Sequence, residues 1–273
     1  MDRIDAAVRE YKNLDMSARE DTFLTRIHPL AKLIVTVYDI VLIVSFHKYN
    51  LSGLLGMILY PLLIFNLGAL SFREAISRLR IVLPLVCIVG ILNPLFDRQV
   101  LFWLGKTAVT GGMVSCLTLM IKGILAVLAS YILAATTPVE KICHAMRLLH
   151  IPRILVTEIL LISRYVTLLM EEAGKVTQAY ALRAPGQKGI AMQAWGSLAG
   201  QMLLRAMDRA GQLYESMRLR GFYGEFDFCR GRQNGAAGID IAYLCGWVML
   251  LTLIRFVPVM EWIGRGLELV VHP

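Results

Sequence analysis

The sequence predicts an all-α integral membrane protein with about five transmembrane helices and a cytoplasmic region of long amphipathic helices between the fourth and fifth. The composition is the first reason: 57% of the residues are hydrophobic, 18% are charged, and the mean hydropathy is +0.61. Soluble domains are about 45–50% apolar and about 25% charged. The second reason is a series of apolar stretches near the length of about 20 residues that a membrane-crossing helix needs.

These patterns divide the chain into four segments. Residues 1–29 are charged and polar, without the apolar core of a signal peptide, and are expected to be cytoplasmic. Residues 30–136 hold transmembrane helices one to four, 137–238 form the cytoplasmic region, and 239–273 hold the last transmembrane helix and an external tail. The five spans are expected at about 30–47, 51–70, 81–96, 114–136 and 239–257.

Two long amphipathic helices are expected in the cytoplasmic region. The first starts near Pro152, a residue suited to a helix start, and runs to Arg183. It is not a sixth span because Glu158 and Arg164 interrupt its apolar part, and a central charge costs about 2.5–3.5 kcal/mol on insertion. The second ends near Gly221, and its apolar residues recur at helical spacing. That stripe consists of Met202, Ala206, Ala210, Leu213 and Met217.

The distribution of lysine and arginine predicts the orientation. With the N-terminus inside, 22 of the 28 basic residues lie in cytoplasmic segments, five lie outside, and one, Lys122, lies within a span. Cytoplasmic loops carry the excess of basic residues in membrane proteins. The sequence therefore predicts a multi-pass protein of the cell membrane, surrounded by lipid, with a cytoplasmic N-terminus.

Each long helix ends in a short stretch that carries arginine. As helix caps, these arginines would only complement the negative end of the helix dipole. As docking points, their guanidinium groups would grip carboxylates of a partner, because the planar fork suits bidentate binding. The repetition of the stretch favours docking. The residues are Ala181, Leu182, Arg183 and Ala184 in the first stretch, and Arg218, Leu219, Arg220 and Gly221 in the second.

Other polar residues give little sign of chemistry. The five cysteines and five histidines are scattered and form no CxxC or HExxH motif, so neither a metal site nor a catalytic residue is expected. Asp39 and Lys122 fall near the middle of spans one and four. Intramembrane charges are expensive and are usually paired or functional. They are interpreted as an intramembrane pair, either structural or in contact with a partner subunit.

The order of motifs resembles a known family. An HP-x-x-K entry (His28, Pro29, Lys32) precedes four spans, "TTPVEKICHAMRLLHIPRILVTEILLISRY" follows them, and the second long helix ends in "SMRLRGF". Over nearly the whole chain this resembles the T component of energy-coupling factor (ECF) transporters. "GILNPLFDR" and "TTPVEK" are similar to the cobalt and nickel branch, CbiQ. The family motif is Ala-Arg-Gly, whereas this chain has Leu-Arg-Ala at 182–184 and Leu-Arg-Gly at 219–221.

The resemblance implies a function and a set of partners. The T component is a scaffold in an ABC-type importer, and its two motifs dock on two ABC ATPase subunits. It would transmit their ATP-driven motion to a substrate-binding membrane subunit, the CbiM-like S component; whether a small accessory membrane subunit joins them is left open. ATP and Mg²⁺ would bind to the ATPases, so no cofactor is expected on this chain, and the cargo would be cobalt or nickel.

Other functions are weighed against this one. A T component for vitamins, or one shared among several importers, would have the same architecture. A membrane enzyme acting on lipids or isoprenoids would need clustered carboxylates for Mg²⁺, and no DDxxD-like cluster is present. An ABC permease with its own substrate path would not need two docking ends in one chain. The chain has no GxxxxGK[ST] phosphate loop, so it is not the ATPase, and no nucleic-acid partner is expected.

Overall fold

The computed structural model describes residues 24, 27–48, 50–68, 70–96, 100–104, 107–186, 189–224 and 237–256. The chain divides into two compact units, with boundaries near residues 137 and 233. The apolar unit comprises the described residues from 24 to 137 together with 237–256. The amphipathic unit comprises the described residues from 138 to 224.

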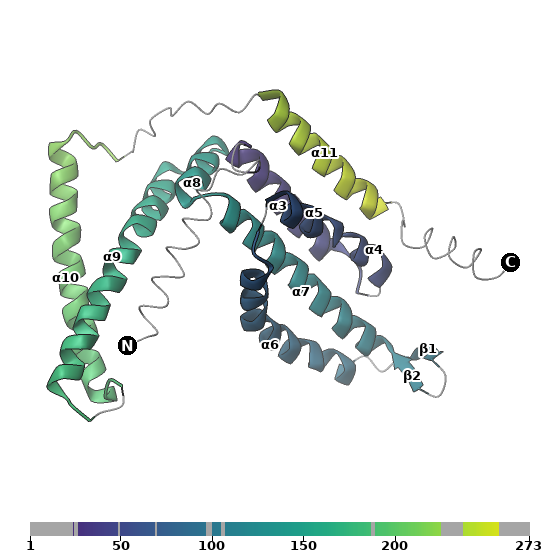
Figure 1. The fold of residues 1–273 in the computed structure, drawn as a ribbon, viewed down its shortest axis with the longest axis horizontal. Coiled ribbons are helices and arrows are strands. Elements are labelled where there is room, and N and C mark those ends of the chain that lie inside the picture. The colour runs from purple at the N-terminus through teal and green to yellow at the C-terminus, as the bar shows by residue number, and fades with distance from the viewer. Residues whose placement is uncertain are drawn as a thin grey trace. The chain divides into compact units, whose positions relative to one another are not determined.

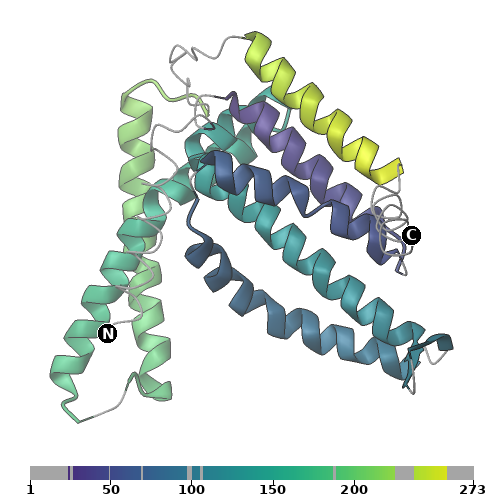
Figure 2. The ribbon, with the colours of Figure 1, turned by 45° about the vertical axis from the view of Figure 1, so that its right-hand side comes forward.

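The apolar unit is a row of helices joined in part by one short hairpin (Figure 1). Its helices are α3 (Pro29–Ser45), α4 (Leu51–Gly56), α5 (Leu59–Gly68), α6 (Phe72–Phe96), α7 (Gly111–Thr136) and α11 (Ala237–Phe256). Figure 2 shows α6 and α11 at the two edges of the row, with α7 and α3 between them. Helix α7 packs against α3, α5 and α6, and α3 also packs against α11. The core lies where α3, α5, α7 and α11 meet.

Three helices of the described chain are long and apolar enough to cross a membrane, at Phe72–Leu92, Gly111–Thr136 and Gly238–Phe256. With 17 residues, α3 lies at the lower end of the about 17–25 residues seen for membrane helices. Helices lie within all five predicted apolar segments, so the all-α membrane class is confirmed. The prediction did not include the antiparallel hairpin of β1 (Val100–Leu104) and β2 (Thr107–Thr110), which connects α6 to α7.

Two predicted spans differ from the structure. The second, 51–70, is not one helix, because α4 ends at Gly56 and α5 begins at Leu59. Pro61 has no N–H to bond to the carbonyl four residues earlier, so it belongs in the first turn of a new helix. The third, 81–96, is too short, because α6 already begins at Phe72 and so includes the charged stretch 73–80. That stretch is rich in good helix formers, which lets the helix start about two and a half turns earlier.

Side-chain contacts tie the apolar unit together. Helix α6 lies close to α7, since a Cβ added at Gly123 would stand 3.1 Å from the side chain of Val86. Tyr131 of α7 donates a hydrogen bond of 3.0 Å to Glu74 of α6. The remaining surface of α6 exposes a row of large apolar side chains, including Ile81, Leu85 and Ile88, as expected of a helix that faces lipid.

The amphipathic unit consists of α8 (Val139–Leu148), α9 (Arg153–Arg183) and α10 (Met192–Leu219). Both long helices agree closely with the predicted ones. Helix α8 ends with His150 in the left-handed region at φ 61°, and Pro152 precedes α9. Helices α9 and α10 run in opposite directions; they lie close together at the end that is joined by the segment after Arg183 and diverge toward the other end (Figure 1).

Candidate functional site

The first arginine stretch lies at the C-terminal end of α9. Arg183 is the last helical residue, and the amide of Ala184 closes the helix with a hydrogen bond of 3.0 Å to the carbonyl of Tyr180. Pro185 follows, and then Gly186 at φ +100°, a conformation that favours glycine. Both Leu182, at 83% exposure, and Arg183 are exposed. The stretch therefore presents an apolar and a cationic side chain together at a fixed helix end.

The second stretch ends α10 with a complete Schellman motif. Gly221 has φ +81°, its amide bonds to the carbonyl of Arg218 at 3.0 Å, and the amide of Phe222 bonds to that of Met217 at 3.0 Å. These are the two hydrogen bonds that define this helix ending. Arg220 is the capping residue and Gly221 the residue after it, so the helix ends near Gly221 as predicted. Leu219, at 89% exposure, and Arg220 project from the end of the helix.

The side chains of the two arginines at these helix ends make no polar contact within the part of the chain that the structure describes. Among the described residues, no hydrogen bond, ion pair or cation–π contact involves the side chain of Arg183 or of Arg220. Arg218, in contrast, lies 5.9 Å from the centre of the Tyr214 ring. Each helix end thus offers an exposed Leu-Arg pair with free guanidinium donors, which is more than a helix cap requires.

The antiparallel arrangement separates the two stretches. Helix α9 ends where α10 begins, so Arg183 and Arg220 lie at opposite ends of the helix pair (Figure 1). The 28 residues of α10 span about 42 Å at about 1.5 Å per residue. The structure therefore does not bring the predicted docking residues together; the two stretches lie apart by about the length of α10, about 40 Å.

An ion-pair cluster joins the two long helices between these ends. Glu172 of α9 accepts a hydrogen bond of 3.0 Å from Arg205, and its second oxygen lies 3.5 Å from Arg209, one turn further along α10. The sequence analysis did not single out this cluster. Two arginines at i and i+4 on a predicted helix, facing a partner helix with adjacent glutamates, are the signal that could have found it.

Much of the apolar surface of these helices is uncovered. No residue of α10 is buried, and Val156 is the one buried residue of α9. The predicted stripe of α10 is its least exposed face, apart from Ala210, which is exposed. Outside that stripe, large apolar side chains remain exposed on both helices: Ile154, Ile162, Trp195, Leu203, Leu204 and Met207. Extensive exposed apolar surface marks a site of interaction.

The predicted pairing of Asp39 with Lys122 is wrong. Lys122 Nζ instead donates hydrogen bonds to the carbonyls of Val44, at 3.0 Å, and Phe46, at the C-terminal end of α3. Asp39 is buried, and its Oδ1 atom has no hydrogen-bond partner among the described residues. The reason is length: α7 has 26 residues and α3 has 17, so the middle of α7 lies level with the end of α3.

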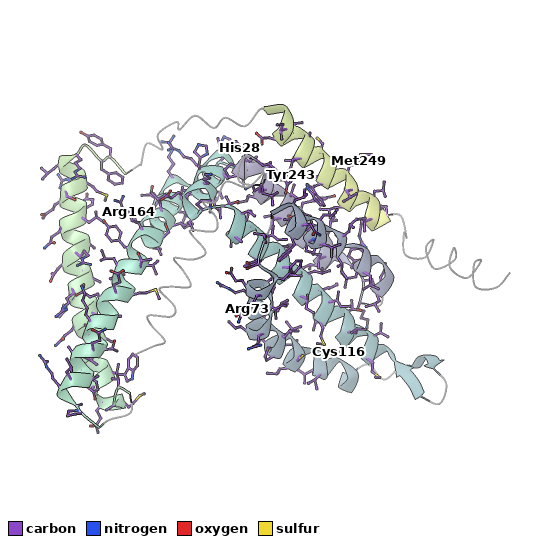
Figure 3. The ribbon with its side chains drawn as sticks, in the orientation of Figure 1. His28, Arg73, Cys116, Arg164, Tyr243 and Met249 are labelled. Atoms are coloured by element: carbon purple, nitrogen blue, oxygen red, sulfur yellow. The ribbon has the colours of Figure 1, made fainter. Side chains whose placement is uncertain are left out.

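A second lysine, Lys32, caps the C-terminal end of α7 in the way that Lys122 caps that of α3. Lys32, in the first turn of α3, donates hydrogen bonds from Nζ to the carbonyl of Thr136 at 3.0 Å and to Oγ1 of Thr137 at 3.4 Å. Each helix thus has its C-terminal end capped by a lysine of the other, the end that favours a positive charge. His28, the first residue of the HP-x-x-K motif (Figure 3), caps the start of α3, because its side chain accepts a hydrogen bond from the Leu30 amide. The backbone amide of His28 donates a hydrogen bond of 2.8 Å to the carboxylate of Asp240 in α11.

No metal-binding cluster of three or more His, Cys, Asp or Glu occurs among the described residues.

Cys143 is buried in α8. This burial is the larger cause, and the negative charge of Glu140 the smaller, of the raised pKa of its thiol.

Comparison with known proteins adds two findings. A family model described as the cobalt transport protein CbiQ matches residues 20–228, more than half of the chain. The cobalt transport protein CbiQ of Salmonella typhimurium is 27% identical over 131 residues, which cover 46% of this chain and 55% of that protein. The match therefore spans about half the length of that relative.

Proposed function

From the premise that this chain belongs to the CbiQ family of cobalt transport proteins, we propose that it is the transmembrane scaffold of an ECF-type importer. In this proposal the chain couples ATP hydrolysis by two partner ATPases to the movement of a substrate-binding membrane subunit. ATP and Mg²⁺ belong to the ATPases. The names of the family and of the relative favour cobalt as the cargo over a vitamin, and transport over a lipid-modifying enzyme.

The observation that carries the proposal is the pair of exposed Leu-Arg helix ends at opposite ends of α9 and α10. An exposed leucine can fill an apolar pocket while the neighbouring guanidinium binds a carboxylate, and arginine is enriched among residues that dominate interfaces. A separation of about 40 Å, the length of α10, is too great for one compact binding pocket. It suits two partner molecules, each bound at one end.

The exposed apolar faces of α9 and α10 support a further partner. Side chains such as Leu203 and Met207 are exposed on a helix with no buried residue, although the helix pair is held by the Glu172 ion pairs. Burial of about 25 cal/mol per Å² of apolar area would stabilise a complex that covers this surface. We assign it to the substrate-binding membrane subunit, on the cytoplasmic side predicted by the charge distribution.

Co-purification with the ATPases tests the proposal. The chain is expressed with them as wild type, Arg183→Glu, Arg220→Glu and the double variant. Arg164→Glu, an exposed α9 position away from both helix ends (Figure 3), is the matched control for the charge change. Losing a buried charged partner at an interface costs about 2–5 kcal/mol, so we expect ATPase recovery to fall more than tenfold in the double variant.

The single variants separate the two sites. Each should lose one ATPase contact and keep the other, which weakens binding less than the double change because two linked contacts reinforce one another. Equal ATPase recovery with wild type, Arg164→Glu and the double variant would show that the arginines are helix caps only, and the proposal would fail.

A further inference from the structure

We propose that Lys32 is a positioning residue for coupling: it fixes the end of α7 at the point where the chain passes into the amphipathic unit. The inference rests on the proposed function, because coupling has meaning only if motion of α9 and α10 drives the membrane helices. It goes beyond that function by naming the contact within the apolar unit that would receive the motion.

The contact is buried and specific. Lys32 is 5% exposed, and its ammonium group donates to the Thr136 carbonyl at 3.0 Å and to Thr137 Oγ1 at 3.4 Å. Thr136 and Thr137 are themselves buried. A lysine is rarely buried to this degree unless its charge is compensated, and here the negative end of the α7 dipole contributes to that compensation.

The contact of Lys32 with Thr136 and Thr137 lies at the junction between the apolar and the amphipathic unit. Thr136 is the last residue of α7, Thr137 follows it, and Pro138 begins the amphipathic unit as the cap of α8. The amides of Lys141 and Ile142 bond to the Pro138 carbonyl, so α8 starts at once. Only Thr137 and Pro138 lie between α7 and α8 in the chain, so we expect a displacement of α8 to act on the residues that Lys32 holds.

Lys32 also passes that displacement to its own helix. It lies in the first turn of α3, whose start is held by the bond from the His28 amide to Asp240 of α11. A displacement of Thr137 is therefore transmitted not only along α7 but also, through these hydrogen bonds, to α3 and α11. Without the lysine, the end of α7 can fray, and motion of α8 is absorbed by local unwinding.

The test compares Lys32→Met with Thr36→Val in the full chain, assembled with its ATPases and substrate-binding subunit. Thr36 is buried one turn away, and its hydroxyl bonds to the backbone carbonyl of Lys32 at 2.9 Å. Its replacement removes a buried hydroxyl without touching the ammonium contact. The readouts are ATPase co-purification, ATP hydrolysis, uptake of radioactive Co²⁺, and hydrogen exchange of residues 137–142.

We expect Lys32→Met to keep its ATPases and hydrolyse ATP, while Co²⁺ uptake per ATP falls about tenfold relative to Thr36→Val, within the range of typical coupling effects. The amides of Thr137 and of residues 139–142 should exchange faster. Lys32→Arg, which keeps a cation and several donors, should restore coupling. Uptake per ATP and exchange equal to those of Thr36→Val would overturn the inference.

Two further outcomes are also decisive. If Lys32→Met does not accumulate in the membrane, Thr137→Val takes its place, because it removes one acceptor and keeps the side-chain shape. Uptake per ATP lower than that of Thr36→Val then supports the inference, and an equal value refutes it. A wild-type chain that binds no ATPase refutes the proposed function, whereas unchanged exchange in the variants refutes the role of Lys32 itself.

Discussion

Gly221 ends α10 directly after Arg220, and replacing it with alanine tests whether the second Leu-Arg end depends on its backbone conformation. At φ +81° an alanine is strained, since left-handed conformations cost about 1–2 kcal/mol for residues with a Cβ. A Cβ at Gly221 would meet no atom within 4 Å. The whole effect is therefore backbone strain, and we expect the helix end to lose about 1–2 kcal/mol.

The control lies in the same helix. Gly211 also has open space at its Cβ, but its φ is an ordinary helical one. Alanine there should stabilise α10 by about 0.5–1 kcal/mol, because glycine is unfavourable within a helix. The two substitutions add the same methyl group, and they are predicted to have effects of opposite sign.

Hydrogen exchange of the amides at positions 221 and 222 is the assay, because these are the amides that close the Schellman motif. A loss of about 1–2 kcal/mol accelerates their exchange about 5- to 30-fold in Gly221→Ala. ATPase binding through this end should weaken as well, since Arg220 loses its fixed position. Unchanged exchange in Gly221→Ala, or the same change as in Gly211→Ala, would refute the reasoning.

Three other predictions concern contacts within the two units. Exchanging the charges of Asp39 and Lys122 should not restore a stability lost in the Lys122→Asp variant, since the lysine caps α3; recovered thermal stability in the double variant would contradict this. Glu172→Gln should weaken the α9–α10 pair by less than about 1 kcal/mol, because its partners are exposed; the rate of disulfide cross-linking between one cysteine introduced on each helix measures this. Burial and the raised pKa of Cys143 should make its alkylation slow at pH 7 and faster only as pH rises above the ordinary thiol range, with the same thiol in the denatured protein as the reference rate.

Regular helical patterns in the sequence predicted most of the fold. The bounds of α9 and α10 follow from polar residues such as Glu158, from Pro152 at one end and from Gly221 at the other, all of which act locally. Hydropathy alone could not show that α4 and α5 are separate, because both are apolar; the proline within the stretch was the local sign of the break.

Contacts between helices were less predictable. Asp39 and Lys122 both lie near the centres of their spans in the sequence, yet their depths differ because α3 and α7 differ in length. Such a register depends on which helices pack together and in which direction, and a single sequence does not contain this information. The motif residue Lys32 was noted only for its resemblance, whereas its contact with Thr136 became visible in the structure.

The reciprocal lysine caps have a mechanical consequence. Sliding α3 along α7 by one helical turn, about 5.4 Å, would break the bonds at Thr136 and Thr137 at one end and those at Val44 and Phe46 at the other, all at once. Hydrogen bonds to charged groups contribute about 1.5–3 kcal/mol each. Because all of these bonds would be lost together, we expect α3 and α7 to keep their register and to move, where they move, as one rigid pair.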